Sequence, residues 1–371
     1  MSNGSSWSGR ARMLALVPVL ALLVACGGGA PEGGDDPAAP GGPTLADVQP
    51  VADPHSYVGP STARLASASV DPIAENPEPE LPLTVTDAQG TSVTVHDASR
   101  ILALDLYGST ARTVYELGLG ENLVGRDTSS AFPEVSHLPL VTPSGHELNA
   151  EAILELAPTL IITDTSLGPW DVVLQMREAG IPVVVVDAER SLETVDDLIR
   201  QVAAAVGLPD EGEALAERTQ ERIDTARAEI AEIAPPAGEG LRTVFLYVRG
   251  GSGIYYLFGQ GSGTDSLITG LGGVDVATEI GWTGMQPVTD EGLIAMQPEV
   301  VLLMTKGLES TGGVDGLLEA VPALASTPAG ENRRFVDMAD TEILSFGPAS
   351  AEVLEALAVA LYAPDAAQVA S

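Results

Sequence analysis

The sequence predicts an α/β protein built from two lobes with mostly parallel sheets, joined by a long rigid helix. Three observations lead to this fold class. Short apolar runs alternate with helical patterns in both halves of the chain, which is typical of parallel sheets covered by helices. An almost uninterrupted helical pattern over residues 191–234 separates the two halves. One segment of the first half also recurs in the second half.

The first half opens on an expected hairpin. The alternating residues 83–86 and 92–95 flank Gln89-Gly90, a turn signal between two strands. Short apolar runs then predict buried strands, and an amphipathic segment between the last two predicts a helix. The predicted strands are 101–106, 160–162 and 183–186, and the predicted helix is 169–179. We therefore expect an N-terminal lobe over residues 83–190.

The middle of the chain is expected to form the connecting helix, residues 191–234. Its helical pattern is broken only near Gly207-Leu208-Pro209, and Pro235-Pro236 end it. A strand at 244–247 and a final helix at 350–362 belong to a second set of α/β signals. Residues 235–371 are therefore expected to form the C-terminal lobe.

The internal repeat is the strongest organisational signal. Residues 148–162 align without a gap with residues 288–302, an offset of 140 residues. In each copy a glutamate, Glu151 or Glu291, opens a short helix, where a negative charge favours the helix dipole. A proline ends each helix before a buried strand. Two equivalent lobes follow from this pattern.

The N-terminus reads as a lipoprotein signal peptide over residues 1–25. Arg10 and Arg12 precede an apolar stretch, residues 13–25, that is too short to span a bilayer. The stretch ends in Leu-Val-Ala before Cys26, the only cysteine, which matches a lipobox. Lipidation of Cys26 would anchor the protein outside the cytoplasm at the cell membrane. The alternative is a lone cysteine that happens to follow a signal sequence.

Residues 26–82 are expected to form a flexible tether. They are rich in Gly, Pro, Ala and Asp, and they show little hydrophobic periodicity. Such a segment would give the folded lobes reach from the membrane.

Composition excludes several functions. The net charge of −35 makes nucleic acid a poor partner, because phosphate binding needs Lys and Arg. One cysteine and four histidines argue against a structural zinc site. No nucleophile elbow or His-Glu-x-x-His pattern is present, and the Gly-rich residues 259–263 lack the Lys of a phosphate loop. We therefore expect that the protein is not an enzyme.

Residues 100–362 resemble the periplasmic-binding family for iron siderophores, cobalamin and haem. The resemblance implies two α/β lobes around a ligand cleft, lined by loops at the carboxyl ends of the strands. It also implies that Glu151 and Glu291 dock onto arginines of an ABC permease dimer, which works with an ATPase. The alternative is that each glutamate is only a favourable helix N-terminal charge, worth about 0.3–1 kcal/mol.

Two residues of the expected cleft loops suit ferric iron in a porphyrin. His146 offers an imidazole nitrogen and Tyr247 a phenolate oxygen, from opposite lobes. Tyrosinate favours ferric haem, but a free phenol with a pKa of about 10 stays protonated at neutral pH. Arg249 lies two residues further, so in a strand it projects on the same side as Tyr247 and would stabilise the phenolate.

The motifs Tyr-Val-Arg-Gly-Gly and Ser-Gly-His resemble the haem-binding lipoproteins of Gram-positive haemin importers. In those proteins the corresponding histidine and tyrosine are the axial ligands. The resemblance implies ferric haem b as the transported ligand, and a monomer that touches the membrane only through its anchor. The alternative is a ferric siderophore or cobalamin, whose metal is already saturated, so that loss of His146 would matter little.

Other pocket residues are expected from their loops alone. Hydroxyls of Ser129 and Ser130 and the backbone around Gly251 are predicted to bind the propionates. Tyr255, Tyr256 and Trp282 are predicted to pack on the porphyrin, although each is equally an ordinary core residue. After Phe346-Gly347-Pro348, many relatives have a basic residue where this chain has Ala349. That departure removes one expected propionate contact.

Overall fold

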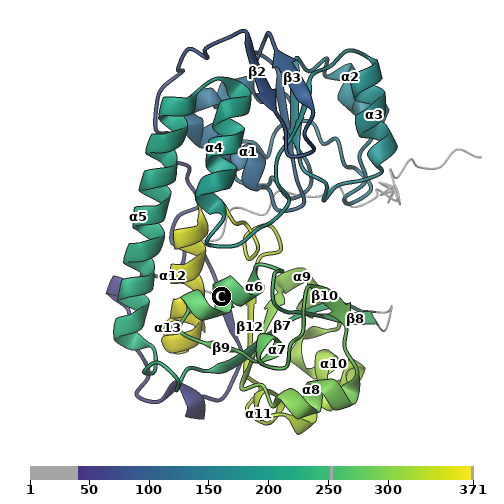
Figure 1. Ribbon diagram of the computed structural model, residues 1–371. Helices are drawn as coiled ribbons and strands as arrows, with labels where there is room; N and C mark the ends of the chain where they lie inside the picture. Colours follow the sequence, from purple (N-terminus) through teal and green to yellow (C-terminus); the bar gives the residue numbers. More distant parts are fainter. Residues whose placement is uncertain (1–40, 251–253, 369–371) are drawn as a thin grey trace, which may run out of the picture. The chain divides into compact units, whose positions relative to one another are not determined.

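The structure is a computed structural model, and it describes residues 41–250 and 254–368. Residues from Pro40 onward form one compact unit. Within it, two α/β lobes are joined along one side by the long helix α5, Pro209–Ile233 (Figure 1). The signal peptide, Cys26 and the first part of the predicted tether lie outside the described residues. None of the described helices has the length and apolarity that crossing a membrane requires.

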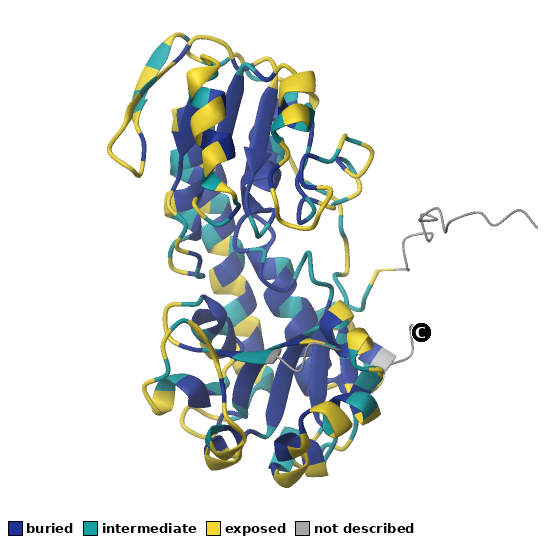
Figure 2. Cartoon of the chain, turned by 90° about the vertical axis from the view of Figure 1, so that its right-hand side faces the viewer, coloured by how far each residue is buried: buried dark blue, intermediate teal, exposed yellow. Residues whose placement is uncertain are grey.

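The N-terminal lobe contains a parallel sheet in the order β4-β5-β6. Ile101 pairs with Leu160, and Ile161 pairs with Val183. Every residue of these strands is buried, as expected of a parallel sheet with helices on its faces (Figure 2). The predicted hairpin is confirmed as the antiparallel pair β2–β3. The elements are β2 Leu83–Thr86, β3 Ser92–Val95, β4 Ile101–Leu104, α1 Ser109–Val114, α2 Ala150–Glu155, β5 Leu160–Thr163, α3 Trp170–Glu178 and β6 Val183–Val185.

The C-terminal lobe contains a mixed sheet in the order β1-β12-β11-β7-β8-β10, with β9 also paired to β7. Strands β1, β12, β11, β7 and β9 run parallel, whereas β8 and β10 are antiparallel to their neighbours. The strands are β1 Ser61–Ala63, β7 Arg242–Arg249, β8 Ile254–Phe258, β9 Val274–Asp275, β10 Met285–Pro287, β11 Val300–Met304 and β12 Phe335–Met338. The helices are α6 Thr264–Gly270, α7 Val276–Glu279, α8 Asp290–Met296, α9 Thr305–Ser310, α10 Gly313–Ala320 and α11 Pro328–Glu331.

The helical stretch between the lobes is divided in two. Helix α4, Val195–Val206, ends at Gly207, whose positive φ of 77° favours glycine, and Pro209 then begins α5. Helix α4 packs on α1 of the N-terminal lobe, so of these two helices it is α5 that spans the lobes. Helix α12, Ser350–Tyr362, packs along α5 and continues into α13, Pro364–Gln368. The buried apolar residues along α5 include Leu215 and Ile223, which fix it against both lobes.

The internal repeat is confirmed in structural detail. Helices α2 and α8 begin at equivalent caps, where the side chains of Asn149 and Thr289 accept hydrogen bonds from the third backbone amide that follows. Both turns end in a left-handed residue, Ala157 with φ 44° and Gln297 with φ 47°. Each is followed by proline and a buried central strand. The two lobes therefore share a supersecondary unit that local sequence specifies.

Residues 41–82, here called the N-terminal strap, are not the flexible tether that their composition predicts. Strand β1 pairs in parallel with β12, with Ser61 opposite Val336. The buried guanidinium of Arg334 donates to the Ser61 hydroxyl (3.0 Å) and to the carbonyl of Leu361 (2.7 Å). The residues that make these contacts are far apart in sequence, so no local periodicity predicts the contacts.

The strap also contacts the connecting helix α5 and the N-terminal lobe. Asp71 accepts a hydrogen bond from Arg222 of α5 (2.7 Å). The amide of Ile73 donates to the carbonyl of Glu116 in the N-terminal lobe (2.7 Å). The strap therefore runs from one lobe to the other alongside α5.

Candidate functional site

Tyr247 lies near the carboxyl end of β7, where the sheet of the C-terminal lobe ends. Alternation along the strand places Tyr247 and Arg249 on the same face. On the antiparallel neighbour β8, Tyr256 lies directly opposite Tyr247, and the two ring centroids are 6.3 Å apart. Tyr247 is half-buried, so its ring is held by packing while part of the side chain reaches solvent.

Arg249 binds the phenol of Tyr247 directly. Its Nε donates to the Tyr247 hydroxyl oxygen at 2.8 Å, and its guanidinium carbon lies 5.1 Å from the ring centroid. On its other side, Arg249 Nη1 lies 3.6 Å from Oδ1 of Asp340. A hydrogen bond donated by a permanent cation favours a negatively charged oxygen. The hydroxyl oxygen of Tyr247 is therefore held against a cation.

His146 belongs to the loop before α2 in the N-terminal lobe. The turn is held by Thr128, whose hydroxyl donates to the carbonyl of Gly145 (2.7 Å), and Gly145 has a positive φ of 90° that favours glycine. Burial lowers the pKa of His146, and the positive charge of Arg249 lowers it further. Both effects keep the imidazole neutral, which is the form that binds metals. His146 lies on the exposed side of its loop, and the charge of Arg249 in the other lobe contributes to the lowered pKa.

The serines predicted to bind propionates are both buried, and only the hydroxyl of Ser129 has a hydrogen-bond partner within the described residues. Ser129 is buried, and its hydroxyl donates to the carbonyl of Leu106 (2.7 Å). Ser130 is fully buried, and its amide donates to Oδ1 of Asp127 (2.7 Å). The Ser129 hydroxyl is therefore engaged within the protein, while burial withdraws Ser130 from the surface of the loop. Gly251, predicted for the same role, lies outside the described residues.

Two of the three aromatic residues predicted to pack on the porphyrin lie on the face of the sheet opposite Tyr247. Tyr255 is paired with Val248, and its hydroxyl donates to Asp290 at the start of α8 (2.6 Å). Trp282 donates from Nε1 to the carbonyl of Leu257 (3.1 Å). Both pack against the core beneath the outer helices, on the side of the sheet opposite Tyr247. Only Tyr256 shares the face of Tyr247.

A buried network of three aspartates and one arginine was not predicted. Asp105 follows β4 and Asp164 follows β5, so both lie at the carboxyl edge of the N-terminal sheet. Arg190 Nη2 donates to Asp164 (2.8 Å) and to Asp105 (3.3 Å). Burial raises the pKa of Asp127 to about 7, and the nearby charge of Asp105 contributes. The sequence signal that could have predicted this network is an aspartate directly after each apolar strand.

The network fixes the shape of the loops around it. Asp105 accepts hydrogen bonds from the backbone amides of Tyr107, Ser109 and Thr110. The guanidinium carbon of Arg190 lies 5.3 Å from the ring centroid of Tyr107. No cluster of His, Cys, Asp or Glu within residues 41–250 and 254–368 is arranged to hold a metal ion. The network therefore preorganises the cleft loops of the N-terminal lobe.

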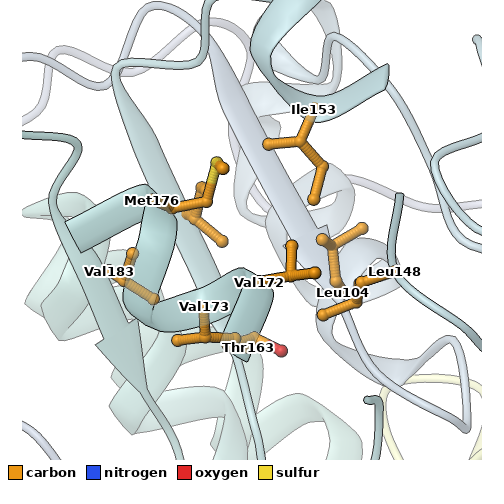
Figure 3. A pocket seen from close by; sticks show the side chains of 9 residues that line it. Leu104, Leu148, Ile153, Thr163, Val172, Val173, Met176 and Val183 are labelled. Carbon is orange, nitrogen blue, oxygen red and sulfur yellow. The ribbon is translucent and has the colours of Figure 1, made fainter. Parts of the chain in front are cut away.

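A small apolar cavity inside the N-terminal lobe is separate from this site (Figure 3). Its volume of about 10 Å³ is close to the space that one water needs, so it excludes any cofactor-sized ligand. It is lined by side chains of the sheet and of α2 and α3, namely Leu104, Leu148, Ile153, Ile161, Thr163, Val172, Val173, Met176 and Val183. It is a packing defect beneath the outer helices.

Two α/β lobes on one long helix, with polar loops at the carboxyl edges of their sheets, define a two-lobed ligand-binding protein. A family model described as periplasmic binding protein matches residues 105–341, and the chain belongs to this family. The solved structure of the heme-binding protein HmuT is 44% identical, with a TM-score of 0.79. That match covers 84% of this chain and 99% of HmuT.

HmuT has also been solved as variants in which an arginine, a tyrosine or a histidine is replaced by alanine. Its replaced tyrosine and arginine are two positions apart, as Tyr247 and Arg249 are here. The ABC transporter substrate-binding lipoprotein YvrC of Bacillus subtilis is 24% identical over 76% of this chain and 86% of its own. The vitamin B12-binding protein of Salmonella choleraesuis is 27% identical over 58% of this chain and 76% of its own.

Proposed function

We propose that this protein is the substrate-binding component of an ABC importer, and that it captures ferric haem b between His146 and Tyr247. The observation that carries the proposal is the hydrogen bond from Arg249 to the Tyr247 phenol, and the charge of Arg249 also helps to lower the pKa of His146. The likeness to HmuT supports it, since the same three residue types were replaced there.

Each residue has a distinct chemical role in this proposal. Tyr247 supplies an anionic oxygen, the donor that favours the ferric state. Arg249 stabilises that anion and is itself oriented by Asp340. His146 supplies a neutral nitrogen from the other lobe. Tyr256 offers an aromatic surface beside Tyr247. The role is transport without catalysis.

The direct test is a haemin titration of the protein without residues 1–26, followed by the Soret band. We expect a saturable one-to-one complex, which Tyr247→Phe weakens by about tenfold or more because the ligand oxygen is lost. His146→Ala should weaken binding less and shift the Soret maximum. Tyr255→Phe is the matched control, because it removes the same atom from the opposite face of the same sheet and should leave binding unchanged.

A wild-type protein that gives no saturable Soret change would refute the haem proposal. Cobalamin is the second candidate, because the vitamin B12-binding protein of Salmonella choleraesuis is among the relatives. A corrinoid whose cobalt is already coordinated needs no axial ligand from the protein. Cobalamin binding that survives His146→Ala and Tyr247→Phe would therefore favour that alternative, and a ferric siderophore would behave alike.

We further propose that Glu151 and Glu291 dock onto the permease dimer. Both are exposed in the first turn of equivalent helices, α2 and α8. Three residues after each glutamate stands an exposed apolar residue, Leu154 (41% exposed) and Ile294 (38%). Equivalent charged and apolar groups on two lobes suit a two-fold partner with basic side chains. The permease would spread the lobes, loosen one axial ligand and so release haem.

The location of the protein is part of the same proposal. A lipid on Cys26 would hold a monomer at the outer surface of the cell membrane, with the permease and its ATPase as partners. The Bacillus subtilis relative is named a lipoprotein, which supports this arrangement.

A further inference from the structure

Lys306 is the only lysine in the 371-residue sequence. It is the second residue of α9, immediately after β11 ends at Met304. Because β11 and β7 are parallel neighbours, Lys306 lies at the same edge of the sheet as Tyr247 and Arg249. Its side chain is exposed. The one lysine of a strongly acidic chain therefore stands at the carboxyl edge where the proposed haem site lies.

Two contacts tie Lys306 to the Tyr247–Arg249 pair. The amide of Lys306 donates to Oδ2 of Asp340 at 2.8 Å, and the other oxygen of Asp340 lies 3.6 Å from Arg249. The next residue, Gly307, packs so closely that a Cβ there would lie 3.0 Å from the carbonyl oxygen of Val248. Lys306 is thus held beside the strand segment that carries both site residues.

The charge of Lys306 is not used within the part of the chain that the structure describes. Its ammonium group has no hydrogen bond or salt bridge to residues 41–250 or 254–368, whereas Arg249 is engaged by Tyr247 and Asp340. A lysine ammonium on a flexible four-carbon stem can reach a ligand carboxylate without rearrangement of the backbone. Of the two serines expected to bind carboxylates, Ser129 donates its hydroxyl to the carbonyl of Leu106, and Ser130 is fully buried.

We propose that Lys306 binds a carboxylate of the ligand, namely a propionate of haem. This inference rests on the proposed haem function and extends it to a second charged residue of the site. Haem carries its propionates on one edge of the macrocycle, away from the axial positions, so a separate cation is needed for them. In a chain of net charge −35, a local cation also offsets the repulsion that an anionic ligand meets on approach.

The test compares haemin with haemin dimethyl ester, whose propionates carry no charge. Lys306→Ala should raise the Kd for haemin about twofold to fivefold, a typical range for an exposed charged contact. It should leave the Kd for the dimethyl ester unchanged. Lys306→Arg should retain haemin binding, because the positive charge is kept. The difference between wild type and Lys306→Ala should also shrink as sodium chloride is raised, because salt screens the contact.

Arg242→Gln is the matched control, since it removes one positive charge from the opposite end of the same strand β7. An equal loss for both ligands, no loss for haemin, or the same loss in Arg242→Gln would overturn the role of Lys306. In each of these cases an unchanged Soret maximum with haemin would leave the axial-ligand proposal standing. Absence of a saturable Soret change in the wild type would instead refute both proposals together.

Discussion

The guanidinium of Arg249 contacts two oxygens, and these two contacts determine the charge distribution around Tyr247. Its Nε binds the Tyr247 phenol, while Nη1 faces Asp340. A guanidinium can serve both because its donors form a planar fork with fixed directions. A lysine at this position would have a single compact charge, so it would hold only one of the two oxygens well.

Single residues also show which parts of the candidate site a sequence can predict. His146, Tyr247 and Arg249 were recognisable because each carries distinctive chemistry within a short motif. Tyr255 and Tyr256 are adjacent in a strand, so only one of them can face the ligand, and alternation alone does not say which. The hydrogen bond from Ser129 to Leu106 spans 23 residues, and no local pattern reveals it.

His55 of the strap gives a prediction about pH. Its Nδ1 lies 2.9 Å from Glu299, and its Nε2 lies 3.1 Å from the carbonyl oxygen of Glu239. Burial opposes the charge of His55, but Glu299, the carbonyl of Glu239 and the charge of Asp53 together outweigh it, so the pKa is raised above 6.5. The stabilisation is therefore fully present below pH 6.5 and is lost as pH rises through the folded-state pKa. His55→Gln should lower the free energy of unfolding at pH 5.5 by about 0.2–1 kcal/mol, and by less at pH 8.5.

Urea unfolding of wild type and variant at the two pH values measures this effect. His96→Gln, which changes an exposed histidine of the N-terminal lobe, controls for loss of an imidazole in general. A difference between wild type and His55→Gln that is the same at both pH values would show that the ion pair does not stabilise the strap.

At the level of elements, the equivalence of α2 and α8 is the most informative feature. Their caps, left-handed ends and exposed positions repeat at a fixed offset, because each feature is encoded within about ten residues of sequence. Strand β1 is the contrasting case. It has three residues, and its partner β12 lies 275 positions further along the chain. Its pairing depends on tertiary contacts, so composition suggested a tether instead.

The two docking glutamates predict a measurable effect on the transporter. The assay places the permease and ATPase in liposomes and adds haem-loaded protein to stimulate ATP hydrolysis. The double variant Glu151→Gln and Glu291→Gln should need about a tenfold higher concentration for half-maximal stimulation. The reason is that two charge-assisted hydrogen bonds are lost, each worth about 1.5–3 kcal/mol before solvent screening.

The control for the docking experiment is the pair Glu178→Gln and Glu319→Gln, which removes exposed charges at the ends of α3 and α10. Stimulation should remain at the wild-type level in this pair. If both pairs lose stimulation equally, net charge rather than a specific surface governs docking. Haem affinity should be unchanged in all four substitutions.

At the scale of the whole molecule, helix α5 and the strap both connect the two lobes in the described part of the chain. The sequence revealed the first through its long helical pattern and missed the second. Two spanning connections limit how far the lobes can separate, so a small opening is the expected motion during ligand release.

Anchoring by Cys26 predicts a change in location without a change in binding. Cys26→Ser should move the protein from the membrane fraction to the soluble fraction, because the thiol that carries the lipid is gone. Incorporation of labelled fatty acid should be lost in the same variant. Ser5→Ala, which leaves the lipobox intact, should behave as wild type. Continued labelling of Cys26→Ser would contradict lipidation at this residue.

Strand β1 has a mechanical consequence for an anchored protein. With the lipid at Cys26, a pull from the membrane would enter the folded unit through the strap, where the amides of Gly42 and Val51 donate to the carbonyls of Leu65 and Tyr362. Behind these contacts, Ser61, Thr62 and Ala63 pair with β12, so several hydrogen-bonded sites would share the tension. The buried hydrogen bond from Arg334 to Ser61 strengthens the attachment of β1 to the C-terminal lobe. Tension from a lipid anchor would thereby be taken up in the C-terminal lobe before it reaches the ligand loops of the other lobe.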